Sequence, residues 1–199
     1  MLYDDLVILD LETTGTSASA HRIIEIGLCE IRNGHLVDEW QSLVNPQIRI
    51  SPFISNYTGI TNTMVATAPT FAAIAPRLFE RLQGKLFVAH NARFDYGFLR
   101  EEFLRLDLDF QLCQMCTVKL SRRLYPAERS HSLDALIRRH DLPLEARHRA
   151  LGDAKSVWSF LQLMQEEWPT ATLQKAIQAS MKIPAGRTFA EASQSTLLL

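Results

Sequence analysis

The sequence predicts an α/β domain built on a five-stranded mixed sheet with helices on both faces. Three β-rich apolar runs follow one another in the first 45 residues, and two further short runs lie at 86–89 and within 109–117. Stretches with the helical spacing of apolar residues follow these runs, and this alternation is typical of an α/β domain. At 199 residues, with 47% hydrophobic and 22% charged residues, the chain is long enough to bury the core of one such domain.

The first strand is expected within residues 5–15, where the apolar run 7–9 precedes Asp10, Glu12 and the turn formers 13–15. Because side chains alternate along a strand, the two carboxylates point to the same side. Carboxylates at the end of a buried strand repel each other and lose hydration unless a cation lies between them. Mg²⁺ or Mn²⁺ suits such oxygen ligands. A strand that fades into a solvated acidic turn would have the same residues, so this stretch alone leaves both interpretations open.

The later elements follow from turn signals and apolar spacing. Residues 23–31 and 36–44 are the next two strands, and Asn33-Gly34 between them is the strongest short signal of a hairpin. Residues 46–69 are rich in Pro and Thr and are expected to form a loop. The remaining elements are expected as a helix at 71–82, a strand at 86–89, a helix at 94–106, a strand within 109–117, and helices at 117–124, 132–140, 149–168 and 170–181.

Composition and the chain ends exclude several classes of protein. No apolar run approaches the ~18 residues of a membrane span, and no signal peptide is visible. Three cysteines, an odd number, favour a reducing compartment, so a cytoplasmic protein is expected. We predict one domain at 1–181 and a loosely ordered tail, or the start of a linker, at 182–199. Residues 194–199 faintly resemble short sliding-clamp-binding peptides, although a free apolar end is the simpler interpretation.

The net charge of −1 is unevenly spread along the chain. Residues 111–155 contain nine basic and five acidic residues, a balance of +4 that leaves −5 elsewhere. A basic stretch beside a cluster of acids would suit a polyanion held against metal ions. A solvated helical surface gives the same count, so both interpretations stay open.

Two further acids and a histidine stand near apolar helix faces. Asp95 shares a face with Phe98 and Leu99, although a carboxylate in the first turn of a helix is also favoured by the helix dipole. Asp153 lies at the border of the apolar stripe of the 149–168 helix. His148, five residues earlier, converges on Asp153 only if it lies in the loop before that helix. Taken alone, it would be a surface histidine between two arginines.

Three segments carry these residues: Asp10-Leu-Glu-Thr-Thr-Gly15, His90-Asn-Ala-Arg-Phe-Asp95 and His148-Arg-Ala-Leu-Gly-Asp153. Over roughly residues 5–168 they resemble the histidine subtype (DEDDh) of the DEDD superfamily of 3′–5′ exonucleases. This group includes the proofreading (epsilon) subunit of bacterial DNA polymerase III and ribonuclease T. Any one motif would be weak, whereas all three in this order make the resemblance specific.

The resemblance implies a ribonuclease H-like fold, a hydrolase activity and a set of catalytic residues, which are Asp10, Glu12, Asp95, His148 and Asp153. Asp10, Glu12 and Asp153 would hold one Mg²⁺ or Mn²⁺ ion, and Asp10 and Asp95 the second. Two such cations stabilise the attacking and the leaving oxygen of a displacement at phosphorus. His148 would take the proton from the attacking water. The residues implied to contact the substrate are Leu11, Thr13, Thr14, Ile60, Asn91 and Phe94.

The implied activity is the removal of nucleoside 5′-monophosphates from the 3′ end of a single strand, with DNA favoured over RNA. A DNA polymerase or a sliding clamp is a candidate partner, in replication or repair, and the oligomeric state is not predicted. An RNA-trimming enzyme of the ribonuclease T kind is the first alternative, because the contacts that discriminate the 2′-hydroxyl are not visible in the sequence. A catalytically idle module that binds nucleic-acid ends or a polymerase is the second. It predicts a missing acid or histidine, and all five are present.

Other polar residues are interpreted as structural. Cys113 and Cys116 have no second cysteine pair with which to hold zinc, so two buried thiols in or after a strand are expected. Glu25, in an apolar strand, is expected to bond to the backbone or to Arg22. His90 is expected to orient its own loop rather than to bind metal.

Overall fold

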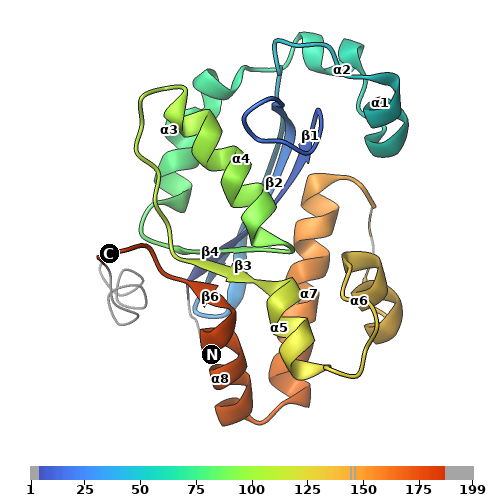
Figure 1. The fold of residues 1–199 in the computed structure, drawn as a ribbon, viewed down its shortest axis with the longest axis vertical. Helices are drawn as coiled ribbons and strands as arrows, with labels where there is room; N and C mark the ends of the chain where they lie inside the picture. Colours follow the sequence, from blue (N-terminus) through green and yellow to red (C-terminus); the bar gives the residue numbers. More distant parts are fainter. Residues whose placement is uncertain (1–4, 144, 146, 187–199) are drawn as a thin grey trace.

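The structure, a computed structural model, describes residues 5–143, 145 and 147–186, so most of the predicted tail lies outside the described residues (Figure 1). One mixed sheet forms the centre, in the order β3-β2-β1-β4-β5-β6. Its strands are β1 (Leu6–Thr13), β2 (Ile23–Arg32), β3 (His35–Leu43), β4 (Leu86–Ala89), β5 (Gln114–Cys116) and β6 (Met181–Lys182). The predicted fold class is confirmed, with six strands rather than five because the chain after the last helix adds the two-residue β6 antiparallel to β5.

The pairing of the strands places β1 in the middle of the sheet. β1 runs antiparallel to β2 and parallel to β4, and β2 pairs with β3 through the predicted hairpin. Asn33 and Gly34 both have positive φ, the backbone conformation that this tight turn requires. Because both faces of β1 are covered, its residues 6–9 are all buried.

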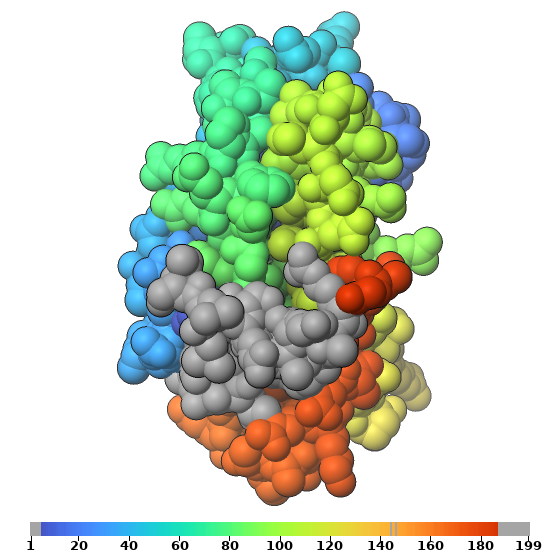
Figure 2. Space-filling model, turned by 90° about the vertical axis from the view of Figure 1, so that its left-hand side faces the viewer, coloured from blue at the N-terminus to red at the C-terminus, as the bar shows by residue number. Residues whose placement is uncertain are grey.

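Helices cover both faces of the sheet. They are α1 (Pro52–Thr58), α2 (Asn62–Ala66), α3 (Phe71–Leu82), α4 (Ala92–Leu104), α5 (Thr117–Leu124), α6 (Leu133–His140), α7 (Ala150–Glu167) and α8 (Thr170–Ser180). Val7 and Leu9 of β1 pack in the core that α3 and α4 share, whereas Leu6 and Ile8 pack in the core of α5 to α8. Figure 2 shows α3 and α4 side by side on one outer surface of the molecule. None of the described helices is both long and apolar enough to cross a membrane.

The prediction of a loop at 46–69 was wrong, because α1 and α2 lie within it. Residues that read as turn formers act here as helix caps. The Ser51 hydroxyl accepts a hydrogen bond from the Ile54 N–H, Pro52 occupies the first turn, and Gly59 ends α1 with φ of 72°. Thr61 caps α2 in the same way.

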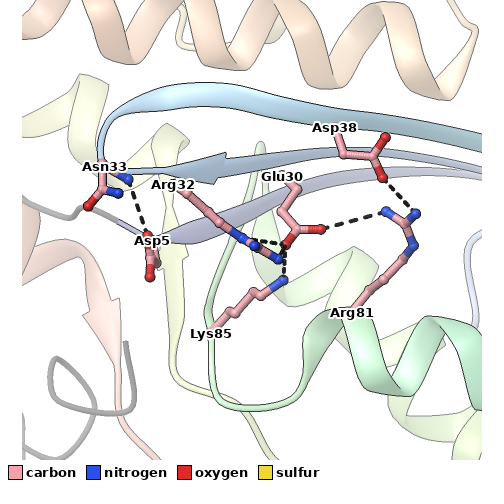
Figure 3. A network of polar contacts seen from close by, with 7 residues as sticks. All are labelled: Asp5, Glu30, Arg32, Asn33, Asp38, Arg81 and Lys85. Carbon is pink, nitrogen blue, oxygen red and sulfur yellow. Dashed lines mark hydrogen bonds and ion pairs between the residues drawn. The ribbon is translucent and has the colours of Figure 1, made fainter. Parts of the chain in front are cut away.

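A polar network fastens the hairpin to the rest of the fold at the end of the sheet remote from Asp10 and Glu12 (Figure 3). The buried Glu30 carboxylate of β2 forms ion pairs with Lys85, Arg32 and Arg81. Arg81 also contacts Asp38 of β3 at 2.6 Å. This cluster is structural, and it provides a comparison for a similar arrangement in the active site.

Candidate active site

The four predicted acids come from three elements and line one open cavity of about 1150 Å³. Asp10 and Glu12 lie near the C-terminal end of β1, Asp95 lies in the first turn of α4, and Asp153 in the first turn of α7. Glu12, Asp95 and Asp153 are 8%, 2% and 4% exposed. The segments are far apart in sequence, and the parallel pairing of β1 with β4 carries α4 to the end of β1 where the first two acids lie.

Burial and mutual repulsion raise the pKa values of these acids. Burial, together with the charges of Asp153 and Glu25, raises the pKa of Glu12 to about 7. Burial raises that of Asp95 to about 8 against two backbone hydrogen bonds. The pKa of Asp10 is raised well above its usual value by burial and then by Asp95, Asp153 and Glu12. Such a cluster is stabilised in its ionised form by cations between the carboxylates.

The donor set fits a divalent cation. Glu12, His148 and Asp153 each offer a ligand atom, and these atoms lie within 4.8 Å of one another. Asp153 Oδ1 is buried and has no hydrogen-bond partner among the described residues. The carboxylate oxygens among these donors are ligands that suit Mg²⁺ or Mn²⁺.

His148 lies in the loop before α7, as it must if it is to converge on Asp153. α7 begins at Ala150, so His148 lies in the preceding loop, with φ of 58°, and it lines the cavity. The ring of Tyr57 lies against it, with ring centroids 4.2 Å apart. His148 is therefore enclosed by Tyr57 on one side and by the acids on the other.

Two residues of β2 hold the start of α7 in place. The buried Glu25 carboxylate accepts hydrogen bonds from Arg149 Nη2 at 2.6 Å and from the Ala150 N–H at 3.0 Å. The expected bond to the backbone is confirmed by the Ala150 N–H, whereas Arg22 as the partner is wrong, because the N-terminus of α7 supplies both a cation and an unsatisfied N–H. A Cβ atom on Gly27 would lie 2.1 Å from the Leu151 nitrogen, so only glycine allows α7 to approach this closely.

The predicted substrate residues divide into two groups. Leu11, Thr13, Asn91 and Phe94 line the cavity. Ile60 is fully buried in a small apolar cluster beside it, and Thr14 is 7% exposed and accepts a hydrogen bond from the Arg22 N–H. Neither Ile60 nor Thr14 is among the residues that line the cavity.

The sequence interpretation missed Phe53 and Tyr57, which are 76% and 56% exposed and line the cavity from α1. Their rings are nearly parallel, with centroids 6.5 Å apart. The spacing i, i+4 after the Ser51-Pro52 cap would have placed both on one face of a short helix. The spacing was not interpreted as helical because residues 46–69 were expected to form a loop.

His90 organises the loop on the other side of the cavity. Its Nε2 lies 3.0 Å from the His131 carbonyl, and its Nδ1 lies 3.0 Å from the Thr117 hydroxyl. Because a carbonyl only accepts, Nε2 carries the proton and Nδ1 is free to accept from Thr117. Burial lowers the pKa of His90 to about 4, so the ring is neutral near pH 7. Both nitrogens are engaged, in agreement with the predicted orienting role.

The chain is similar to known exonucleases. Residues 7–159 match the family model RNase_T, described as exonuclease. DNA polymerase III PolC-type of Caldanaerobacter subterraneus subsp. tengcongensis is 39% identical over 166 residues, 83% of this chain and 12% of that protein. The 3′–5′ exonuclease DinG of Staphylococcus haemolyticus is 35% identical over 77% of this chain and 17% of its own length. The chain thus spans less than a fifth of these curated relatives.

A solved structure extends the similarity to the fold. Exonuclease X, solved in complex with 5′ overhanging duplex DNA, has a TM-score of 0.69 and 29% identity, covering 86% of this chain and 99% of that one. The family match covers the strand, the helices and the loop that carry all five predicted catalytic residues. The chain therefore belongs to the RNase_T family of exonucleases, and the resemblance drawn from its three acidic segments is confirmed.

Proposed function

We propose that this domain is a metal-dependent 3′–5′ exonuclease that removes nucleoside 5′-monophosphates from the end of single-stranded DNA. The observation that carries the proposal is the convergence of Asp10, Glu12, Asp95, Asp153 and His148 in one open cavity. Four carboxylates with raised pKa values are costly to keep together, and such clusters mark functional sites. The name of the relative DinG supports the 3′–5′ direction.

The acids would hold two divalent cations, with Asp10, Glu12 and Asp153 on one and Asp10 and Asp95 on the other. When bound, the cations would stabilise the negative charge that develops on the attacking and leaving oxygens. His148 is the candidate general base, because a ring nitrogen of its imidazole lies within 4.8 Å of carboxylate oxygens of Glu12 and Asp153, and histidine is the side chain that most often serves as a general base. Tyr57 packs on the ring and limits its rotation.

The shape of the cavity supports a single strand as substrate. Its volume of about 1150 Å³ exceeds that of drug-sized pockets of ~300–1,000 Å³ and leaves room for more than the terminal nucleotide. Phe53, Tyr57 and Phe94 offer rings to unpaired bases, and stacking on rings tolerates every base. Arg122 and Arg129 also line the cavity, where they could neutralise phosphates of the strand.

DNA is favoured over RNA because one relative is named for DNA polymerase III and Exonuclease X was solved with DNA. A polymerase as partner is proposed from the PolC-type relative alone. The single domain at 1–181, the cytoplasmic location and a sliding-clamp partner stay predictions.

The deciding experiment uses 5′-labelled single-stranded DNA and RNA of matched sequence, with Mg²⁺, Mn²⁺ or EDTA. Unmodified protein is compared with Asp10→Ala, His148→Ala and Asp38→Asn, the last changing a carboxylate that does not line the cavity. We expect shortening from the 3′ end that is lost with EDTA and in the first two variants only. Faster loss of RNA than of DNA would select the RNA-trimming alternative. Intact strands of both kinds would refute the nuclease proposal and favour the idle binding module.

A further inference from the structure

Arg147 joins two helices across the active site. It lies in the loop between α6 and α7, where its Nε donates a hydrogen bond to Asp134 Oδ1 at 2.6 Å. Its Nη1 forms an ion pair with Asp153 Oδ2. Asp134 stands in the first turn of α6 and Asp153 in the first turn of α7. One guanidinium therefore links a half-exposed acid outside the catalytic cluster to a buried acid within it.

This bridge makes the two oxygens of Asp153 different. Oδ2 is bound to Arg147, whereas Oδ1 is buried and has no hydrogen-bond partner among the described residues. A carboxylate held through one oxygen keeps its plane and presents the other oxygen in a fixed direction. Hydrogen bonds of this kind to ligating groups commonly tune metal sites. Arg147 thus leaves Oδ1 as the oxygen of Asp153 that is open to a cation.

The same bridge bears on His148, the next residue in the chain. His148 has φ of 58°, a left-handed conformation that is strained for a residue with a Cβ atom and persists only where the surroundings fix it. Both neighbours of His148 are anchored, since Arg147 binds Asp134 and Asp153 while Arg149 binds Glu25. The strained residue is held from both sides.

We propose that Arg147 is a positioning residue, which fixes the Asp153 carboxylate and the His148 backbone by dividing its guanidinium between Asp134 and Asp153. The proposal deepens the proposed function and rests on it for the role of His148. It also assigns a part to Asp134, which does not line the cavity and would otherwise be an ordinary surface acid. Sharing the guanidinium with Asp134 keeps part of its charge away from the acid cluster.

The chain contains a closely matched arrangement far from the cavity. Arg81 contacts Asp38 at 2.6 Å and also pairs with the buried Glu30 (Figure 3). The side chains of Asp38 and Asp134 are 46% and 48% exposed, and those of Glu30 and Asp153 are 6% and 5% exposed. Asp38→Asn therefore removes an arginine partner of the same exposure without touching the site, although Arg81 lies 3.6 Å from Glu30 and pairs with it more loosely than Arg147 pairs with Asp153.

The test compares Asp134→Asn, Arg147→Gln and Arg147→Lys with their double variant Asp134→Asn/Arg147→Gln and with Asp38→Asn. Mn²⁺ affinity is measured by calorimetry without nucleic acid, and kcat and KM are measured on single-stranded DNA. We expect Asp134→Asn to lower the Mn²⁺ affinity about 10-fold and kcat about 10-fold, with KM unchanged. Arg147→Lys should restore little of the Mn²⁺ affinity and kcat lost in Arg147→Gln, because an ammonium lacks the planar fork that spans two carboxylates. Asp38→Asn should lower thermal stability as much as Asp134→Asn while leaving kcat and Mn²⁺ affinity unchanged.

The double variant decides whether Asp134 acts through Arg147. We expect Asp134→Asn to have no further effect once Arg147 is glutamine, because the bridge is already gone. Unchanged Mn²⁺ affinity and kcat in Asp134→Asn would overturn the proposal. So would a raised KM with unchanged kcat in Arg147→Gln, which would assign Arg147 to a substrate phosphate. If the unmodified protein binds Mn²⁺ but cuts no strand, the proposed function fails while the Mn²⁺ affinities still decide the role of the bridge.

Discussion

The carboxylate of Glu25 in β2 accepts hydrogen bonds from both Nε and Nη2 of Arg149, 124 residues later in the chain. The same carboxylate accepts from the Ala150 N–H and so caps α7. Because Arg149 follows His148 and α7 carries Asp153, this one contact fixes the distance between the central sheet and two proposed catalytic residues.

Replacing Glu25 by glutamine is expected to affect activity more than stability. The amide keeps the size of the side chain but loses the charge that binds Arg149, whose side chain is 40% exposed and can turn to water. We expect a loss of roughly 1–3 kcal/mol in the free energy of unfolding and a fall in kcat of about 10-fold or more. Urea unfolding and exonuclease rates measure the two effects. Glu39→Gln is the control, because it alters an ion pair with Lys155 at the surface. An equal fall in kcat in this variant would argue against a specific role of Glu25.

Replacing Gly27 by alanine is expected to displace α7. The added Cβ would lie 2.1 Å from the Leu151 nitrogen, and neither backbone can yield without moving the helix. We expect a loss of ~1–3 kcal/mol of stability, as for an overpacked core, with activity falling well beyond the unfolded fraction. Gly97→Ala is the control, because a Cβ there meets nothing within 4 Å and alanine favours its helix, α4. Full activity of Gly27→Ala would show that the approach of α7 is not needed.

The stability of the protein in EDTA is expected to fall as pH rises. Glu12 and Asp95 have folded-state pKa values of about 7 and about 8, above their ordinary values of 4.5 and 3.8. Between about pH 4 and pH 8 the unfolded chain therefore binds fewer protons than the folded one, and unfolding becomes easier with each rise in pH. Saturating Mn²⁺ should remove this slope, because it binds the ionised carboxylates. Urea unfolding across this pH range measures the slope of stability against pH.

Asp95→Asn tests the origin of that slope. The neutral amide removes the acid whose pKa is about 8, so the variant is expected to be more stable than the unmodified protein at pH 8 in EDTA and to lack activity. A stability curve that keeps its full slope in this variant would place the titration elsewhere.

The exposed rings of α1 are expected to contribute to substrate affinity. Stacking of one base on an aromatic side chain is worth ~1–3 kcal/mol, so Phe53→Ala should raise KM roughly 5-fold or more. Tyr57→Ala should also lower kcat, because Tyr57 packs on His148, whereas Tyr57→Phe should retain both constants. Met64→Ala, which changes an exposed apolar residue of α2 that does not line the cavity, is the control. Equal KM values for Phe53→Ala and Met64→Ala would exclude stacking.

Local patterns predicted most of the fold. The alternation at 5–15, the Asn33-Gly34 turn and the apolar stripes of the later helices are governed by neighbouring residues, so their elements were confirmed. The short helices α1 and α2 were missed because caps and turns use the same residues, and only packing decides between them. The strand β6 was missed because two residues carry no pattern of their own and pair with β5 only once the sheet exists.

The acids of the site were predictable, whereas the groups that hold them were not. Asp10 and Glu12 are close in sequence, and Asp95 and Asp153 carry recognisable motifs. The partners Glu25 and Arg149 are separated by more than a hundred residues, and nothing local distinguishes Arg149 from Arg22 as the partner of Glu25. The partners of Arg147 could not be predicted either, because Asp134 and Asp153 lie on different helices.

The docking of α7 on Gly27 also sets when the active site can form during synthesis. Asp10 leaves the ribosome 153 − 10 = 143 residues ahead of Asp153, a lag of roughly 7–30 s at ~5–20 residues per second. Until α7 reaches β2, the growing chain has its first two acids but neither His148 nor Asp153. A nascent polypeptide that ends before His148 is therefore expected to lack nuclease activity, because it contains neither the proposed general base nor the fourth acid.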